Sequence, residues 1–150
     1  MIEEMLQKII GGKMNMTISN EQLIDAAISA IDLCFVCSDN TKKRYGCAVL
    51  TEKGNIYKTS QYSSFNHITN IHAEMGAIYL ASMNNDPLIT KLVLVCSENV
   101  STTPASCGIC LQFIHEHVSR TKKDIEIIYS SLDKTKIVIH KLDDLLPIRW

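Results

Sequence analysis

Apolar residues recur at helical spacing in three stretches of the chain, and each stretch predicts an amphipathic helix. The first covers about residues 20–34, after a capping-box pattern in which Ser19 is followed three positions later by Gln22. Its apolar face comprises Leu23, Ala26, Ala27, Ala30, Ile31 and Cys34. The second covers 71–85, with an apolar face of Met75, Ile78, Tyr79 and Met83. The third covers 107–120.

Strand-like runs alternate with these helices. Residues 45–50 and 55–62 flank the turn "EKGN", where Gly54 can supply the positive φ of a hairpin. Three more apolar or alternating runs follow, at 91–98, 124–131 and 136–142. The order helix, hairpin, helix, strand, helix, strand, strand predicts an α/β domain in which helices cover a central sheet.

The first 16 residues differ from the rest and predict a separate N-terminal extension. They carry apolar residues at helical spacing, followed by the pair Gly11-Gly12, which ends the pattern. We therefore expect an extension over 1–16 and one domain over 17–150.

Charge and composition narrow the class of protein. The net charge is -1 and the pI is about 6.5, so nothing in the overall balance favours nucleic acid or an anionic membrane as a partner. No apolar stretch has the length of a transmembrane helix, and acidic residues stand near the start, where a signal peptide needs basic ones. We expect a cytoplasmic protein whose six cysteines are metal ligands or buried thiols.

The residues that carry chemistry stand at the starts of the second and third helices. "HAE" provides His72 and Glu74, and "CGIC" provides Cys107 and Cys110. One imidazole and two thiolates are a three-ligand set for Zn²⁺ that leaves a fourth position open, as in catalytic sites. A nearby carboxylate can then move protons. The pair H-x-E and P-C-x-x-C is typical of zinc deaminases, although Ser106 stands here in the place of the proline.

On these residues the chain resembles the cytidine deaminase family. "YGCAVLTEKGNIY" resembles the family's first hairpin, "IHAEMGAI" and "CGICLQ" resemble its two zinc-binding helices, and "DDLLPIRW" resembles its Leu-Leu-Pro tail, which ends in an aromatic residue. The resemblance covers residues 17–150. It implies a three-layer α/β/α fold with a central mixed sheet of about five strands.

The resemblance also implies a reaction, which is zinc-dependent hydrolysis of cytidine, deoxycytidine or a related cytosine nucleoside analogue to the uracil form with release of ammonia. His72, Cys107 and Cys110 would bind the zinc ion, and Glu74 would be the catalytic proton carrier. The backbone of Ala73 would hold the pyrimidine edge. A homotetramer is the expected assembly, with a dimer as the alternative.

The sugar side of the expected pocket departs from the family pattern. Gln61, Ser63 and Ser64 stand where relatives have the ribose-binding segment Asn-x-Glu-Asn. Gln61 remains a candidate substrate-binding residue, whereas Ser63 is neutral and too short to replace a carboxylate. The exact substrate therefore stays open.

Two other functions remain possible with the same motifs. One is deamination of cytosine within single-stranded nucleic acid, which the charge balance disfavours. The other is a non-catalytic domain stabilised by zinc, which has no use for Glu74. For the second cysteine pair, Cys34 and Cys37, we favour helix packing over a second metal site. We expect Cys47 and Cys96 to be buried thiols, and His115 and His117 to be solvated.

Overall fold

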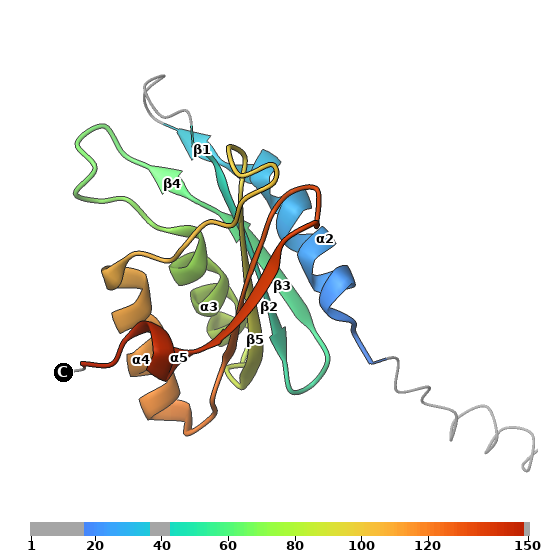
Figure 1. Cartoon of the computed structure of the whole chain (residues 1–150). Coiled ribbons are helices and arrows are strands. Elements are labelled where there is room, and N and C mark those ends of the chain that lie inside the picture. Colours follow the sequence, from blue (N-terminus) through green and yellow to red (C-terminus); the bar gives the residue numbers. More distant parts are fainter. Residues whose placement is uncertain (1–16, 37–42, 149–150) are drawn as a thin grey trace, which may run out of the picture.

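The computed structural model describes residues 17–36 and 43–148, and its centre is a mixed sheet of five strands (Figure 1). The strand order is β3-β2-β5-β6-β7. The strands are β2 (Tyr45–Thr51), β3 (Ile56–Ser60), β5 (Ile89–Cys96), β6 (Glu126–Ser130) and β7 (Ile137–Lys141). The β5–β6 pair is parallel, and the other three pairs are antiparallel. The expected mixed sheet is confirmed.

Helices cover both faces of this sheet (Figure 1). Helix α2 (Asn20–Ala30) lies on one face, and α3 (Ala73–Met83) and α4 (Gly108–Thr121) lie on the other, with the short α5 (Leu142–Leu145) beside α4. Each face has its own apolar core. On one face, Ile24 of α2 and Val93 of β5 are fully buried. On the other face, Ile114 of α4 and Leu92 of β5 are fully buried. The three-layer α/β/α arrangement is confirmed. No described helix has the length and apolar character needed to cross a membrane.

Helix α2 begins as the sequence predicts but ends early. Ser19 Oγ accepts a hydrogen bond from Gln22 N at 3.1 Å, and Gln22 Oε1 accepts one from Ser19 N at 2.9 Å, which completes the capping box. After Ala30 the chain tightens into the 3-10 helix η1 (Ile31–Leu33) and then extends as β1 (Phe35–Val36). The predicted helical position of Cys34 is therefore wrong. Cys34 is half-buried beyond the helix, and Cys37 lies outside the described residues.

The early end of α2 follows from pairing with a distant segment. Strand β1 forms a small parallel sheet with β4 (Tyr62–Ser63), and the ring of Phe35 stacks on that of Tyr62 at 5.2 Å. The predicted strand over 55–62 is accordingly split, because β3 ends at Ser60 before β4 begins. The hairpin turn itself is confirmed, with Gly54 at a φ of +84°.

Helix α3 packs through Ile78, as its sequence predicts, and otherwise through small residues and not through the larger members of the predicted face. Ala73, Ala77 and Ala81 are buried, whereas Tyr79 and Met83 are 62% and 64% exposed. Small side chains let the helix lie close to the hairpin. At Gly76, an added Cβ would lie 3.1 Å from Thr59 Oγ1 on β3. This close contact fixes the start of α3 next to the sheet, where His72 and Glu74 lie.

Candidate active site

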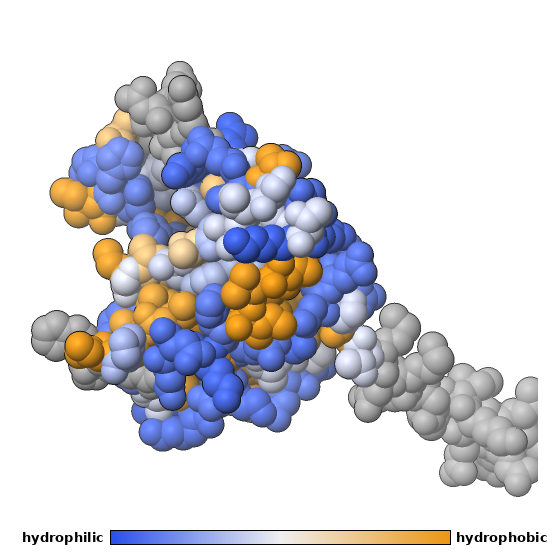
Figure 2. Space-filling view, viewed as in Figure 1, coloured by the Kyte–Doolittle hydropathy of each residue, from blue (hydrophilic) through white to orange (hydrophobic). Residues whose placement is uncertain are grey.

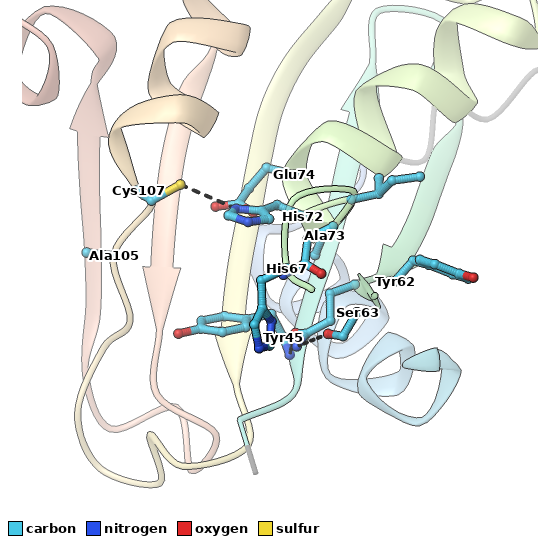
Figure 3. Close-up of a pocket in the computed structure, with 12 residues that line it drawn as sticks. Tyr45, Tyr62, Ser63, His67, His72, Ala73, Glu74, Ala105 and Cys107 are labelled. Atoms are coloured by element: carbon cyan, nitrogen blue, oxygen red, sulfur yellow. Dashed lines mark hydrogen bonds between the residues drawn. The ribbon is translucent and has the colours of Figure 1, made fainter. Parts of the chain in front are cut away.

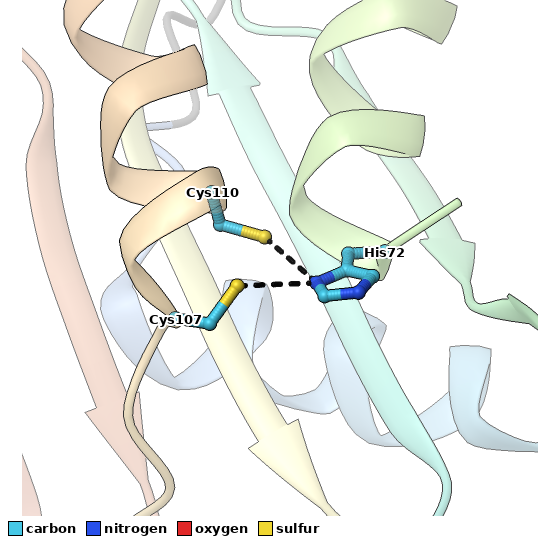
Figure 4. Close-up of side chains that lie close together, drawn as sticks. All are labelled: His72, Cys107 and Cys110. Carbon is cyan, nitrogen blue, oxygen red and sulfur yellow. Dashed lines mark hydrogen bonds between the residues drawn. The ribbon is translucent and has the colours of Figure 1, made fainter. Parts of the chain in front are cut away.

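Three potential metal ligands meet at the starts of two helices (Figure 4). His72 is the N-cap residue of α3, Cys107 is the N-cap residue of α4, and Cys110 lies in the first turn of α4. His72 Nδ1 lies 3.2 Å from Cys110 Sγ and 3.3 Å from Cys107 Sγ. All three ligand atoms are within 4.8 Å of one another. The structure thus brings together the three residues that the motifs single out.

The spacing of these atoms fits a zinc ion. A tetrahedral zinc ion with Zn–N near 2.0–2.1 Å and Zn–S near 2.3 Å holds a nitrogen and a sulfur ligand about 3.5 Å apart. The two nitrogen–sulfur distances, 3.2 and 3.3 Å, are close to this value. His72 and Cys107 also line an open cavity, so the cluster is accessible from one side. One imidazole and two thiols with one open side are a donor set for catalytic zinc.

Glu74 lies beside the cluster, in the first turn of α3, and lines the same cavity (Figure 3). Its side chain is buried, at 4% exposure. Burial, and next the negative charge of Glu74, raises the pKa of the Cys110 thiol. The same two causes raise the pKa of Cys47 well above its ordinary value. A cation held by Cys107 and Cys110 would offset this accumulation of negative charge and favour the thiolate forms.

The cavity has a volume of about 240 Å³ and opens between the β4–α3 loop and the start of α4 (Figure 2). Two of the ligand residues, His72 and Cys107, form one end of it with Glu74 and Ala73. The carbonyl of Ala73 accepts a hydrogen bond from Thr59 Oγ1 at 2.7 Å, which ties the start of α3 to β3. The other end, away from Cys107, includes Tyr45 of β2, Ser63 of β4 and His67 of the loop after β4 (Figure 3). Gln61, between β3 and β4, and Asn70, in the same loop as His67, also line the cavity.

Solved bacterial structures share this architecture. The cytidine deaminase of Burkholderia pseudomallei has a TM-score of 0.77 at 18% identity, over 89% of this chain and 100% of that one. The Mycobacterium tuberculosis enzyme gives 0.70 at 18% identity, over 89% and 98%. The Bacillus anthracis enzyme gives 0.57 at 22% identity, over 87% and 88%. The chain has the cytidine deaminase fold. No protein-family model matches its sequence.

Gln61, the candidate substrate-binding residue, has a side-chain amide that is already engaged in hydrogen bonds within the chain. Gln61 Oε1 accepts a hydrogen bond from Tyr45 N at 2.8 Å. Its Nε2 donates to the carbonyl of Lys43 at 3.0 Å and to Ser63 Oγ at 3.2 Å. Gln61 lines the cavity, and its side chain joins the start of β2 to β4. A substrate contact by Gln61 stays a prediction.

His67, in the loop before "HAE" where the sequence places the mouth of the pocket, does line the cavity, and so does Asn70, which the motifs do not identify. His67 adopts a left-handed backbone conformation, with a φ of 62°. Asn70 Oδ1 accepts hydrogen bonds from Ser64 N at 2.7 Å and Ser64 Oγ at 3.1 Å. The sequence carries only a weak signal for Asn70, because it belongs to a polar loop whose path depends on tertiary contacts.

A second missed residue holds the cysteine loop. The backbone N–H of Ser106, next to Cys107, donates a hydrogen bond to the phenol of Tyr129 on β6 at 3.1 Å. A proline, as in the usual motif, has no N–H and could not make this bond. The Tyr129 ring also contacts His140 on β7, at a centroid distance of 5.4 Å. The departure at Ser106 is thus matched by a contact that fixes the backbone beside a ligand.

The remaining cysteines and histidines have structural surroundings. Cys47 and Cys96 are fully buried free thiols, as expected. The expectation that His115 and His117 are solvated is wrong, because both are half-buried where α4 meets neighbouring elements. His117 Nε2 lies 2.7 Å from the carbonyl of Pro87, in the segment that leads into β5. Trp150 lies outside the described residues.

Proposed function

We propose that the protein is a zinc-dependent hydrolytic deaminase of a cytosine-type ring. The observation that carries this proposal is the position of Glu74. It is a buried carboxylate that faces the same cavity as a His-Cys-Cys cluster with zinc spacing. The cytidine deaminase fold supports the same reaction, and cytidine, deoxycytidine or a cytosine nucleoside analogue is the proposed substrate.

The roles follow from the chemistry of each side chain. His72, Cys107 and Cys110 hold the ion. A zinc ion held there supplies Lewis-acid activation of a water molecule for attack on an amidine carbon. Glu74 takes one proton from the water and delivers it to the ring nitrogen N3, and then takes the proton of the new C4 hydroxyl and delivers it to the departing amino group. A carbon–oxygen bond forms at C4, the carbon–nitrogen bond to the amino group breaks, and ammonia leaves. The buried backbone of Ala73 supports the edge of the ring.

We also propose that the chain assembles with copies of itself, as a homotetramer or alternatively a dimer. The exposed apolar side chains support this proposal: apolar residues gather over β7, where Ile137 and Ile139 are 44% and 50% exposed (Figure 2). Light scattering coupled to size-exclusion chromatography gives the number of chains directly, and a monomer at micromolar concentration would contradict it.

The reaction is tested by combining metal analysis with an assay for loss of cytosine absorbance and release of ammonia. The substrates are cytosine, cytidine, deoxycytidine and a single-stranded oligonucleotide, so that action on nucleic acid is detected separately. We expect one zinc ion per chain and deamination of a small cytosine compound.

Cys110→Ser is the decisive variant and Cys34→Ser is its matched control, because Cys34 is half-buried but is no member of the cluster. The first variant should lose zinc and activity together, and the second should keep both. Full activity in zinc-free protein, or no ammonia from any cytosine compound, would refute the proposal.

A further inference from the structure

The end of the cavity away from Cys107 has a hydrogen-bonding character of its own. We call it the distal end and define it by Ser63 and His67 (Figure 3) and by Asn70, which lines the same cavity and is hydrogen-bonded to Ser64 N, next to Ser63. The hydrogen bonds that these side chains form within the chain determine which of their polar atoms remain available to a ligand.

Asn70 offers donors to the cavity. Both hydrogen bonds from Ser64, at 2.7 and 3.1 Å, end on Asn70 Oδ1, so the carbonyl of the amide has two partners. Because one of these donors is a backbone N–H, the orientation of the amide is fixed by chemistry. The amide NH₂ of Asn70 forms no hydrogen bond within the described part of the chain. Two N–H donors therefore remain.

Ser63 is also left with a donor. Its Oγ accepts a hydrogen bond from Gln61 Nε2 at 3.2 Å, and its own O–H has no acceptor among the described residues. Ser63 is almost fully buried, at 4% exposure, so its hydroxyl points to protein or to the cavity and not to bulk water. Gln61 cannot accept the Ser63 hydroxyl proton through its Nε2, because both N–H groups of that nitrogen are donors that already have partners.

His67 adds a third group to the distal end. It lines the cavity, and no described residue bonds to its imidazole. A φ of 62° is costly for a residue with a side chain, and such conformations are retained where the surroundings or function require them. An imidazole donates from one nitrogen when neutral and from both when charged.

The distribution of charge in the cavity also favours hydrogen-bond donors over acceptors at the distal end. Glu74 is the one carboxylate among the described residues that line the cavity, and it lies at the metal end. No described carboxylate is available at the distal end to accept hydrogen bonds from sugar hydroxyls. A site that offers donors without an acceptor carboxylate selects ligands rich in acceptors, and charge-assisted hydrogen bonds to an anion are the strong ones.

We propose that the distal end binds an anionic group, a carboxylate or a phosphate, carried by the N1 substituent of the cytosine-type substrate. This inference rests on the proposed function, since a ring held at the metal end directs its N1 substituent along the cavity. The substrate would be a cytosine nucleotide or a nucleoside with an acidic sugar, and cytidine itself would be a poorer substrate.

The test compares kcat/KM for cytidine, cytidine 5′-phosphate and the cytidine derivative with a 5′-carboxylate. The last two separate a phosphate requirement from a carboxylate requirement. We expect at least one anionic compound to exceed cytidine by about tenfold or more.

Asn70→Asp is the key variant, because aspartate keeps an acceptor for Ser64 N but replaces the NH₂ donors by a charged acceptor. It should lower the ratio of anionic to neutral kcat/KM at least about tenfold. Asn66→Asp is the matched control. It adds the same charge to the same loop, at a residue that does not line the cavity and whose Oδ1 accepts from Ile68 N at 3.2 Å and from Ser64 Oγ at 3.3 Å. This control should leave the ratio unchanged.

His67→Ala provides a second variant that does not depend on the packing around Ser64, since His67 is exposed. It should lower the same ratio, and calorimetric titration of the unreacted anionic compound into Glu74→Gln protein should show the same loss of affinity. Cytidine equal to or better than both anions, or equal effects of Asn70→Asp and Asn66→Asp, would overturn this inference while leaving the deaminase proposal intact. Failure of every cytosine compound to react would instead refute the deaminase proposal.

Discussion

Helix α3 has a buried carboxylate near each end, and the two differ in the hydrogen bonds that they accept. Asp86, just after the helix, is 2% exposed, and Glu74, in its first turn, is 4% exposed. Asp86 Oδ2 accepts hydrogen bonds from Thr51 Oγ1 at 2.7 Å, Asn55 Nδ2 at 2.9 Å and Tyr57 OH at 3.2 Å. Glu74 receives none from a nitrogen or oxygen donor in the described residues.

This difference separates a structural carboxylate from a chemical one. A buried charge costs free energy unless hydrogen bonds or a counter-ion compensate it. The bonds to Asp86 come from the β2–β3 hairpin, so its charge fastens the hairpin to the end of α3. Glu74 instead faces a cavity and a cluster of metal ligands, where a carboxylate can exchange protons with a bound molecule. Asp86 therefore stabilises the fold at the C-terminal end of α3, and Glu74 is placed for chemistry at its N-terminal end.

The largest expected effect comes from neutralising the reactive end. Glu74→Gln should lower kcat by about 10²–10⁴, the usual contribution of a general acid–base group. The melting temperature should stay the same or rise, because the substitution removes a buried charge that no nitrogen or oxygen donor of the described residues compensates. Steady-state assays and thermal unfolding measure the two quantities on one sample.

The matched control for this prediction is Asp86→Asn, which neutralises the other buried carboxylate. It should leave kcat near the wild-type value at a temperature where the variant is folded. Comparable losses of kcat in the two variants would remove the functional distinction between the two ends.

The next effect concerns the metal end alone. Tyr129→Phe removes the acceptor of the Ser106 N–H bond but keeps the ring that contacts His140. Loss of a bond that orients the backbone beside a ligand should lower zinc affinity about 10–100-fold. Competition with a chromophoric chelator measures this affinity, and the thiolate-to-cobalt absorption of Co²⁺-loaded protein reports the ligand geometry.

Two variants make this second prediction specific. Ser106→Ala keeps the backbone N–H and should bind zinc like the wild type. Tyr57→Phe removes a phenol from the Asp86 network at the other end of α3, so it should lower stability without changing zinc affinity. Equal affinities in Tyr129→Phe and wild type would show that the Ser106 bond does not position Cys107.

Local patterns predicted much of the fold, because the capping box at Ser19, the turn at Gly54 and the apolar strand runs are written within a few residues. The ligand cluster was predictable for the same reason, since each ligand belongs to a short motif at a helix start. The end of α2 was not, because it depends on pairing between β1 and β4, which are distant in the sequence. Nor was the Asp86 network, whose members come from a hairpin about 30 residues earlier.

The third effect is the stability supplied by the Asp86 network. Asp86→Asn should lower the free energy of unfolding by about 1–3 kcal/mol at neutral pH, because hydrogen bonds to a charged group become bonds to a neutral one. Urea denaturation followed by circular dichroism measures the change. Asp32→Asn is the matched control, since Asp32 is exposed and outside the network, and it should change stability by no more than about 0.5 kcal/mol.

The smallest effect is the dependence of this difference on pH. Burial by itself would raise the pKa of Asp86, but the hydrogen bonds from Asn55, Thr51 and Tyr57, together with the Lys53 ammonium 4.0 Å away, outweigh it and lower the pKa. A carboxyl whose pKa is lower in the folded state adds stability above its unfolded value of about 4 and loses that stability as the pH falls through the folded value. The gap in unfolding free energy between wild type and Asp86→Asn should therefore stay constant from pH 7 to about pH 5 and narrow below about pH 4. A gap that stays constant on acidification would mean that the charge of Asp86 is not what fastens the hairpin, and the contrast with Glu74 would then rest on burial alone.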